Sequence, residues 1–249
     1  MIKFENTEVV GWGHAIRGMR NSMNSWEKSD TIFVEDREYH NICGDSGPYY
    51  SVEEAPYGEQ PVDGVLIGMY DLDLMKRLRN AGTDHRKFMR MIAAYVDITA
   101  PLYWWKEFDT YKVGTVTNSC STMHKIHTKE FTLEDFSTEQ LFDENRIPIR
   151  FGEGQIDFFT SKEFFQYTID MLNAHRRAYL ETEEKCYWWQ MIQLLPSSYN
   201  QKRTVMMNYE VLANIYKSRK NHKLDEWSIG FIDWIELLPY SELITGKFV

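Results

Sequence analysis

The sequence predicts a single α+β domain. Helical and strand-like segments follow one another irregularly, without the strand–helix–strand repetition that indicates a parallel sheet. Of the 249 residues, 43% are hydrophobic and 15% are aromatic, which is typical of a chain that folds. A chain of this length can bury a sizeable core. The sequence contains no internal repeat, low-complexity tract or clear linker, so we expect one domain over residues 1–249.

The first quarter of the chain is expected to hold one strand, one short helix and a long loop. Residues 2–10 alternate loosely between apolar and polar side chains, which predicts an opening strand. Residues 15–24 are predicted as a short helix. Gly, Pro, Asp and Tyr are concentrated at about residues 36–63, and such a composition predicts a loop-rich insertion.

The next segments are shorter and more apolar. Apolar residues recur at helical intervals over residues 71–81, and Gly82 is placed to end that helix. Another helix is expected to begin near Asp84. Residues 89–98 fit a buried helix and a buried strand equally well, because an apolar run of this length has no distinctive period.

The second half of the chain contains three longer helical patterns. Residues 164–183 are strongly helical. A further helix is predicted over about residues 198–218, because apolar side chains recur there at helical spacing. The last helix is predicted over residues 225–237, and Pro239 closes it.

The charge balance limits the classes of partner. The net charge is -9 and the isoelectric point is about 5.3, whereas nucleic-acid binding generally needs a basic surface. We therefore expect no general nucleic-acid binding, although a few arginines in a cleft would suffice for a small anionic substrate. No apolar run approaches the ~18 residues of a membrane span, and no signal peptide is visible. Three irregularly spaced cysteines do not indicate a disulfide framework. These features predict a soluble cytoplasmic protein that does not enter a membrane.

Residues 98–124 join an apolar strand to a dense polar block. Within it, residues 119–122 read Ser-Cys-Ser-Thr, a composition that favours a helix N-cap or a turn. A second interpretation makes Cys120 a nucleophile. A third assigns Cys120, His124 and His127 to zinc, although no matching second pair of ligands is evident.

A dipeptide, Ala100-Pro101, ends the apolar strand and leads into a helical stretch that contains Glu107. The polar tetrapeptide Asn118-Ser-Cys-Ser121 follows. This order of motifs resembles the signature of the flavin-dependent thymidylate synthases, the ThyX family, in which Ala-Pro precedes an Arg-His-Arg motif and an Asn-x-x-Ser. When the family signature is aligned to this chain without a gap, its serine falls on Cys120. When one residue is inserted, its serine falls on Ser121.

The Arg-His-Arg motif of the family is replaced in this chain. Counted without gaps from Ala100-Pro101, its positions fall on Thr110, Tyr111 and Lys112. Only Lys112 keeps a positive charge, and lysine does not reproduce the bidentate fork of arginine. Because one preorganised donor typically contributes ~3 kcal/mol to such a site, the resemblance implies a diverged relative with changed substrate, changed chemistry or none.

A second block matches the family without a gap. Residues 191–196 resemble the family's Arg-x-Val-Leu-Pro, with the arginine replaced. Residues 208–219 resemble Asn-x-x-x-Leu-x-Asn-Phe-Leu-x-Leu-Arg. The resemblance places Arg219 where the family holds the nucleotide. With the first block, it covers roughly residues 72–240.

The resemblance implies a fold, a reaction and a set of site residues. The implied fold has a central, mostly antiparallel sheet packed with helices. The implied reaction is a FAD-dependent transfer of a one-carbon unit to C5 of dUMP, with reduced nicotinamide and methylenetetrahydrofolate as co-substrates, in a homotetramer with sites between subunits. No metal is implied. The implied catalytic groups are Ser121, Cys120 and Lys112; the nucleotide contacts are Arg219, Glu107, Asn118 and Ser121; the flavin contacts are Asn208, Asn214, His222 and Thr110.

Three alternatives remain open. Arg219 together with Lys217 and Lys220 fits a solvated basic turn, as most charge runs do. The chain also fits a non-catalytic relative that binds a nucleotide or serves in an assembly, since the Arg-His-Arg motif is missing. In the third alternative the chain is an unrelated α+β domain.

Overall fold

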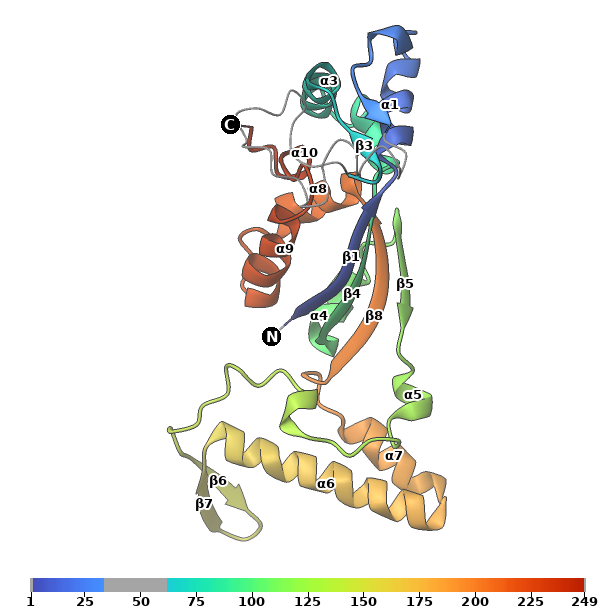
Figure 1. The fold of residues 1–249 in the computed structure, drawn as a ribbon. Coiled ribbons are helices and arrows are strands. Elements are labelled where there is room, and N and C mark those ends of the chain that lie inside the picture. Colours follow the sequence, from blue (N-terminus) through green and yellow to red (C-terminus); the bar gives the residue numbers. More distant parts are fainter. Residues whose placement is uncertain (1, 34–61, 249) are drawn as a thin grey trace, which may run out of the picture. The chain divides into compact units, whose positions relative to one another are not determined.

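The computed structural model describes residues 2–33 and 62–248 (Figure 1). The expected loop-rich insertion at about residues 36–63 lies almost wholly outside the described residues. Within the described ranges, no helix is both long and apolar enough to span a bilayer.

Strands and helices are mixed along the described chain. The strands are β1 (Lys3–Val10), β2 (Ile32–Phe33), β3 (Val65–Leu66), β4 (Ala93–Pro101), β5 (Thr115–Ser119), β6 (Ile147–Phe151), β7 (Gln155–Phe159) and β8 (Asn200–Asn208). The α-helices are α1 (Trp12–Asn21), α3 (Met69–Asn80), α4 (Leu102–Phe108), α5 (Thr122–Lys125), α6 (Ser161–Thr182), α7 (Lys185–Leu194), α8 (Tyr209–Arg219), α9 (Ile232–Glu236) and α10 (Glu242–Thr245). Shorter helical turns are η1 (Trp26–Lys28), η2 (Arg86–Arg90), η3 (Leu133–Asp135) and the π-helical turn η4 (Glu226–Phe231).

A four-stranded antiparallel sheet with the order β1-β4-β8-β5 lies at the centre of the topology. The pairs β2–β3 and β6–β7 form separate antiparallel ribbons. In β4, the side chains of Ala94, Val96, Ile98 and Ala100 are buried at every second position, which is the period of a strand. The expected α+β class with an antiparallel sheet is confirmed.

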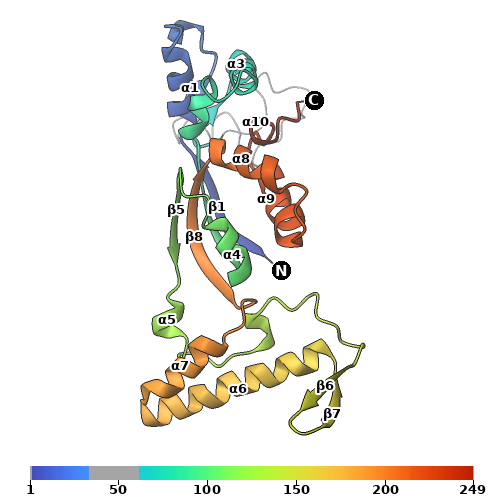
Figure 2. The same ribbon diagram turned by 180° about the vertical axis from the view of Figure 1, so that it is seen from behind.

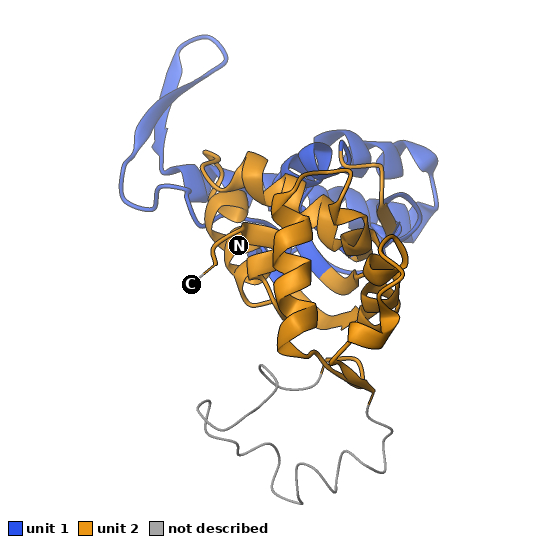
Figure 3. Cartoon of the chain, turned by 90° about the horizontal axis from the view of Figure 1, so that it is seen from above, with its two compact units in different colours: residues 1–3, 98–110, 118–203 blue, residues 4–97, 111–117, 204–249 orange. Residues whose placement is uncertain are grey.

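The described residues cluster into two compact units, coloured in Figure 3. Each of the four sheet strands contributes residues to both units. The expectation of a single domain stays a prediction. Unit 1 comprises residues 1–3, 98–110 and 118–203, and unit 2 comprises residues 4–97, 111–117 and 204–249.

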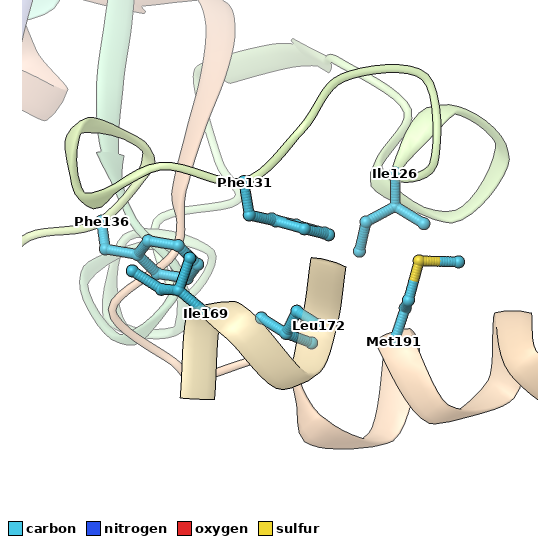
Figure 4. Close-up of a cluster of buried hydrophobic side chains, with 6 residues drawn as sticks. All are labelled: Ile126, Phe131, Phe136, Ile169, Leu172 and Met191. Carbon is cyan, nitrogen blue, oxygen red and sulfur yellow. The ribbon is translucent and has the colours of Figure 1, made fainter. Parts of the chain in front are cut away.

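The core of unit 1 is built on α6 and α7, which lie side by side in Figures 1 and 2. Thr160 and Glu163 form a reciprocal capping box at the start of α6, which satisfies two backbone donors. The buried Asn173 side chain bonds both the N–H (2.9 Å) and the carbonyl (2.8 Å) of Phe131, and so ties that loop to α6. The buried apolar side chains, drawn in Figure 4, are Ile126, Phe131, Phe136, Ile169, Leu172 and Met191.

The core of unit 2 is rich in aromatic rings. The buried Trp12 ring lies 5.3 Å from Tyr209 and 5.2 Å from Tyr240, centroid to centroid. The Tyr209 hydroxyl donates a hydrogen bond of 2.6 Å to the carbonyl of Pro239. This bond joins the start of α8 to the segment before α10.

One predicted helix is partly wrong. The helix expected over about residues 198–218 is a strand, β8, up to Asn208, and a helix, α8, only from Tyr209 onward. In β8, Val205 and Met207 are buried at every second position, which is a strand period. The Asn208 side chain then accepts a hydrogen bond of 3.0 Å from the N–H of Val211, and this N-cap begins the helix.

We expect Tyr209→Phe to lower the free energy of unfolding at neutral pH. We also expect the variant to lose less of this free energy than wild type when the pH is raised. Burial, and next the charge of Glu242, raise the pKa of the Tyr209 phenol well above its ordinary value. The folded state therefore favours the neutral phenol. Its contribution to stability is complete below the unfolded pKa of about 10 and is lost as the pH rises toward the folded pKa.

Urea unfolding at about pH 7 and at about pH 10.5 checks this expectation. Tyr209→Phe should lose about 1 kcal/mol at the lower pH, because the bond to Pro239 is gone, and it should lose less stability than wild type between the two. The control is Tyr70→Phe, because the Tyr70 side chain is 74% exposed. If all three proteins lose the same free energy of unfolding between the two pH values, the pKa of Tyr209 does not differ between the folded and unfolded states.

Candidate functional site

The first candidate site is in unit 2, at the end of α8. Arg219 is the last residue of that helix. Its Nε donates a hydrogen bond of 2.9 Å to the Tyr111 hydroxyl. Its guanidinium carbon lies 4.8 Å from the centre of the Trp227 ring and 5.6 Å from that of Tyr111. The hydrogen bond to Tyr111 and the cation–π contacts with both rings therefore help to orient the guanidinium.

His222 belongs to the same group of side chains. The backbone N–H of His222 donates to the carbonyl of Arg219 at 3.0 Å. The centre of the His222 ring lies 6.4 Å from that of the Trp227 ring. The N–H of Leu224 donates to Nδ1 of His222 at 3.2 Å, so in the neutral ring the proton is on Nε2. We call Arg219, His222, Tyr111 and Trp227 the Arg219 cluster. It brings together two residues that the sequence predicted.

Two other predicted flavin contacts are Asn208, the N-cap of α8, and Asn214, within α8, and each has its amide oxygen engaged. The Oδ1 of Asn208 accepts from the N–H of Val211, as described above. The Oδ1 of the exposed Asn214 accepts from Arg86 Nη2 at 3.0 Å. Gly114 gives Asn208 its space: its φ is +74°, and a Cβ there would lie 2.6 Å from Asn208 Nδ2.

Two arginines of η2 neutralise the buried Glu210 of α8. Arg86 lies 3.5 Å from Glu210 Oε1, and Arg90 also forms an ion pair with that carboxylate. Two guanidinium groups thus share the Glu210 carboxylate, and one of them, that of Arg86, also bonds Asn214. Lys112, the predicted catalytic lysine, is exposed and follows Tyr111 in the chain.

The other predicted residues belong to unit 1. Thr110 is exposed, and its hydroxyl donates to the carbonyl of the half-buried Glu107 at 2.7 Å, so it closes the end of α4. Asn118 is exposed on β5. Ser121 Oγ accepts from the N–H of His124 at 3.2 Å, which makes it the N-cap of α5. The N-cap interpretation of the Ser-Cys-Ser-Thr sequence is thus confirmed.

Cys120 is exposed and forms no disulfide. Its backbone N–H donates to the carbonyl of Lys202 at 3.0 Å, so the turn is joined to β8. We call residues 120–122 the Cys120 turn. Over residues 2–33 and 62–248, no three His, Cys, Asp or Glu side chains are grouped so as to hold a metal ion, which leaves the zinc interpretation without support there.

Sequence reasoning missed Arg203, on β8 in unit 1. Its guanidinium carbon lies 4.1 Å from the centre of the Trp105 ring. Its Nε donates to Gln201 Oε1 at 2.9 Å, and its Nη1 donates to Asp109 Oδ1 at 2.6 Å. The residue was missed because residues 198–218 were predicted as one helix. In a strand, Gln201 and Arg203 share a face, which is the signal that was available.

Comparisons with known proteins identify the fold. No protein-family model and no curated protein matches the sequence. Among solved structures, Thymidylate Synthase X (ThyX) from Helicobacter pylori with FAD and dUMP is similar, with a TM-score of 0.60 and 14% identity over 99% of this chain and 98% of that chain. A second structure of the Helicobacter pylori enzyme with FAD and dUMP gives 0.59 and 15% over 98% and 100%.

A UMP/dUMP methylase, PolB from Streptomyces cacaoi, bound with 5-Br UMP, gives a TM-score of 0.46 and 10% identity over 87% of this chain and 74% of that chain. The two Helicobacter pylori structures match nearly the whole chain. The resemblance drawn from the sequence motifs is therefore confirmed at the level of the fold: this chain has a ThyX-like fold.

Proposed function

We propose that this chain binds a pyrimidine deoxynucleotide of the dUMP type, with Arg219 as a phosphate ligand. The observation that supports this best is the orientation of the Arg219 guanidinium by Tyr111 and Trp227. A guanidinium held in place loses little freedom when it binds a phosphate, and its planar fork matches two phosphate oxygens. The ThyX-like fold supports the choice of nucleotide, because solved structures of that fold contain dUMP.

The residues that resemble flavin contacts suit a flavin. The amide oxygens of Asn208 and Asn214 are already bonded to Val211 N–H and to Arg86. Each carboxamide is thereby oriented with its Nδ2 as the remaining donor, and a flavin presents carbonyl and phosphate oxygens as acceptors. The Arg86 guanidinium, which bonds Asn214, is a cation of the kind that suits a diphosphate. When bound and reduced by the nicotinamide co-substrate, the flavin would supply the hydride that reductive methylation of C5 requires.

The remaining predicted residues belong to the same proposal. Asn118 of β5, Ser121 of the Cys120 turn and Glu107 of α4 are the further proposed contacts to the pyrimidine nucleotide. Ser121, Cys120 and Lys112 are the candidate catalytic groups, with His222 and Thr110 as further flavin contacts. The protein acts in the cytoplasm as a homotetramer, with reduced nicotinamide and methylenetetrahydrofolate as co-substrates.

A second candidate is a nucleotide-binding protein without catalysis. Tyr111, which stands at the histidine position of the missing Arg-His-Arg motif, is bonded to Arg219. At this position the Tyr111 phenol orients Arg219, the proposed phosphate ligand. A neutral phenol there does not supply the positive charge that would polarise a pyrimidine ring. Since each lost donor costs a factor of about 10² to 10³ in rate, this candidate predicts binding with no turnover.

Two measurements on freshly purified protein test the proposal and separate the candidates. The first is calorimetric titration with dUMP, together with an absorption spectrum in the flavin bands with and without dUMP. The second is release of tritium from C5-labelled dUMP in the presence of FAD, reduced nicotinamide and methylenetetrahydrofolate. Binding with release supports the enzyme, and binding without release supports the second candidate. Colourless protein that takes up no FAD and gives no heat with dUMP would overturn both.

We expect Asn208→Asp and Asn208→Ala to separate the capping role of Asn208 from flavin binding. Aspartate is as good an N-cap as asparagine, so Asn208→Asp should keep its stability within about 0.5 kcal/mol, whereas Asn208→Ala should lose about 1 kcal/mol. Aspartate has no Nδ2 donor, so Asn208→Asp should bind FAD about tenfold more weakly. Urea unfolding and titration of flavin fluorescence measure the two quantities. FAD binding unchanged in Asn208→Asp would remove Asn208 from the flavin contacts.

A further inference from the structure

Gln201 is the centre of a hydrogen-bond relay in unit 1. Its Nε2 donates to the carbonyl of Cys120 at 3.1 Å and to Thr122 Oγ1 at 2.9 Å. Its Oε1 accepts from Arg203 Nε at 2.9 Å. Its backbone carbonyl accepts from Trp105 Nε1 at 3.0 Å. The one residue therefore connects α4, β8 and the Cys120 turn.

Arg203 determines which way the Gln201 amide faces. A guanidinium has donors only, so the amide oxygen of Gln201 must face Arg203 and its Nε2 must face the Cys120 turn. The Arg203 side chain is 13% exposed, and that of its partner Asp109 is 49% exposed. With the Trp105 ring 4.1 Å from its guanidinium carbon, Arg203 has little freedom to turn away.

We propose that Gln201 and Arg203 are positioning residues, which hold the Cys120 turn in the shape that contacts the pyrimidine nucleotide. This inference rests on the proposed function, because it takes that turn as a nucleotide contact. The carboxamide of Gln201 accepts from Arg203 with its oxygen and donates to the turn with its nitrogen at the same time. Arg203 of β8 thus supports the Cys120 turn. This turn follows Thr110, Tyr111 and Lys112, the positions at which the Arg-His-Arg motif is missing.

Two variants test the relay in opposite ways. Gln201→Glu keeps the shape and the acceptor for Arg203 but replaces the donor that faces the Cys120 carbonyl. Arg203→Met keeps an apolar stem against Trp105 but no longer fixes the amide. The control is Gln190→Glu, an exposed glutamine of α7 with the same change of charge.

The first measurement is hydrogen exchange of the ligand-free protein, followed in peptides over residues 118–126 and, for comparison, over residues 165–175 of α6. Gln201→Glu loses a hydrogen bond to the turn, and Arg203→Met no longer holds the amide that makes this bond. Exchange over residues 118–126 is therefore expected to be about tenfold faster in both variants, with no change in α6 or in Gln190→Glu. Unchanged exchange over residues 118–126 in both variants would overturn the relay, and equal acceleration in α6 would show a general loss of stability in its place.

The second measurement is the Kd for dUMP of the same proteins by calorimetry. Both variants are expected to bind dUMP about tenfold more weakly than wild type and Gln190→Glu. A Kd unchanged in both variants, with exchange accelerated, would overturn the role in nucleotide binding. If wild type itself binds no dUMP, the proposed function fails, whereas the exchange measurement still decides whether the relay holds the turn.

Discussion

Replacing Arg219 by methionine is expected to weaken dUMP binding about 100-fold, since a charge-assisted arginine–phosphate contact contributes roughly 2–3 kcal/mol. Methionine keeps an apolar stem against Trp227 and removes the charge and the fork. Arg219→Lys should fall between wild type and Arg219→Met, because lysine keeps the charge without the fork. Calorimetric titration with dUMP measures all three proteins.

Lys220→Met is the matched control for this prediction. Lys220 is exposed and follows Arg219 directly, so its removal changes the net charge equally. If Arg219 merely belongs to a solvated basic turn with Lys217 and Lys220, the two methionine variants should bind dUMP alike. That result would contradict the role of Arg219 as a phosphate ligand.

Trp227→Ala is expected to cost about 4 kcal/mol of the free energy of unfolding, as typical Trp→Ala changes in a core do. The Trp227 side chain is fully buried. Its ring lies 5.2 Å from Phe231 and faces the Arg219 guanidinium at 4.8 Å. The change therefore leaves a cavity in unit 2 and also removes the support of Arg219. We expect the remaining folded protein to bind dUMP more weakly.

Urea unfolding checks the stability part, with two comparisons. Trp26→Ala removes an indole from the same unit that is 51% exposed, and it should cost within about 1 kcal/mol. Trp227→Phe keeps a ring beneath Arg219 and should retain most of the dUMP affinity while losing part of the stability. A Trp227→Ala variant no less stable than Trp26→Ala would contradict the packing described for η4.

Strong periodicity made some elements predictable. The helix expected over residues 164–183 is α6, at Ser161–Thr182, and the opening strand expected over residues 2–10 is β1. The strand β8 was not predictable in the same way, because residues 200–204 are polar. In the structure, two of those polar side chains, Gln201 and Arg203, belong to the relay. A polar half-strand with such contacts has no apolar alternation for a sequence pattern to show.

The Arg219 cluster was only half predictable. The resemblance to the ThyX family placed Arg219 and His222 among the predicted site residues, and the ungapped count from Pro196 supported only Arg219. The contact between Arg219 and Tyr111 joins residues 108 positions apart, and no local pattern encodes such a pair. Tyr111 had been identified only as the residue at the missing histidine position. Its hydrogen bond to Arg219 shows what the phenol does there.

A calorimetric comparison of dUMP with deoxyuridine, in wild type and in Arg219→Met, tests the central claim most directly. The two ligands differ only in the phosphate, so the pair of proteins and the pair of ligands form a cycle that isolates the contact between Arg219 and the phosphate. We predict that wild type prefers dUMP by about 100-fold and that Arg219→Met binds the two ligands equally. An unchanged preference for dUMP in Arg219→Met would contradict the account.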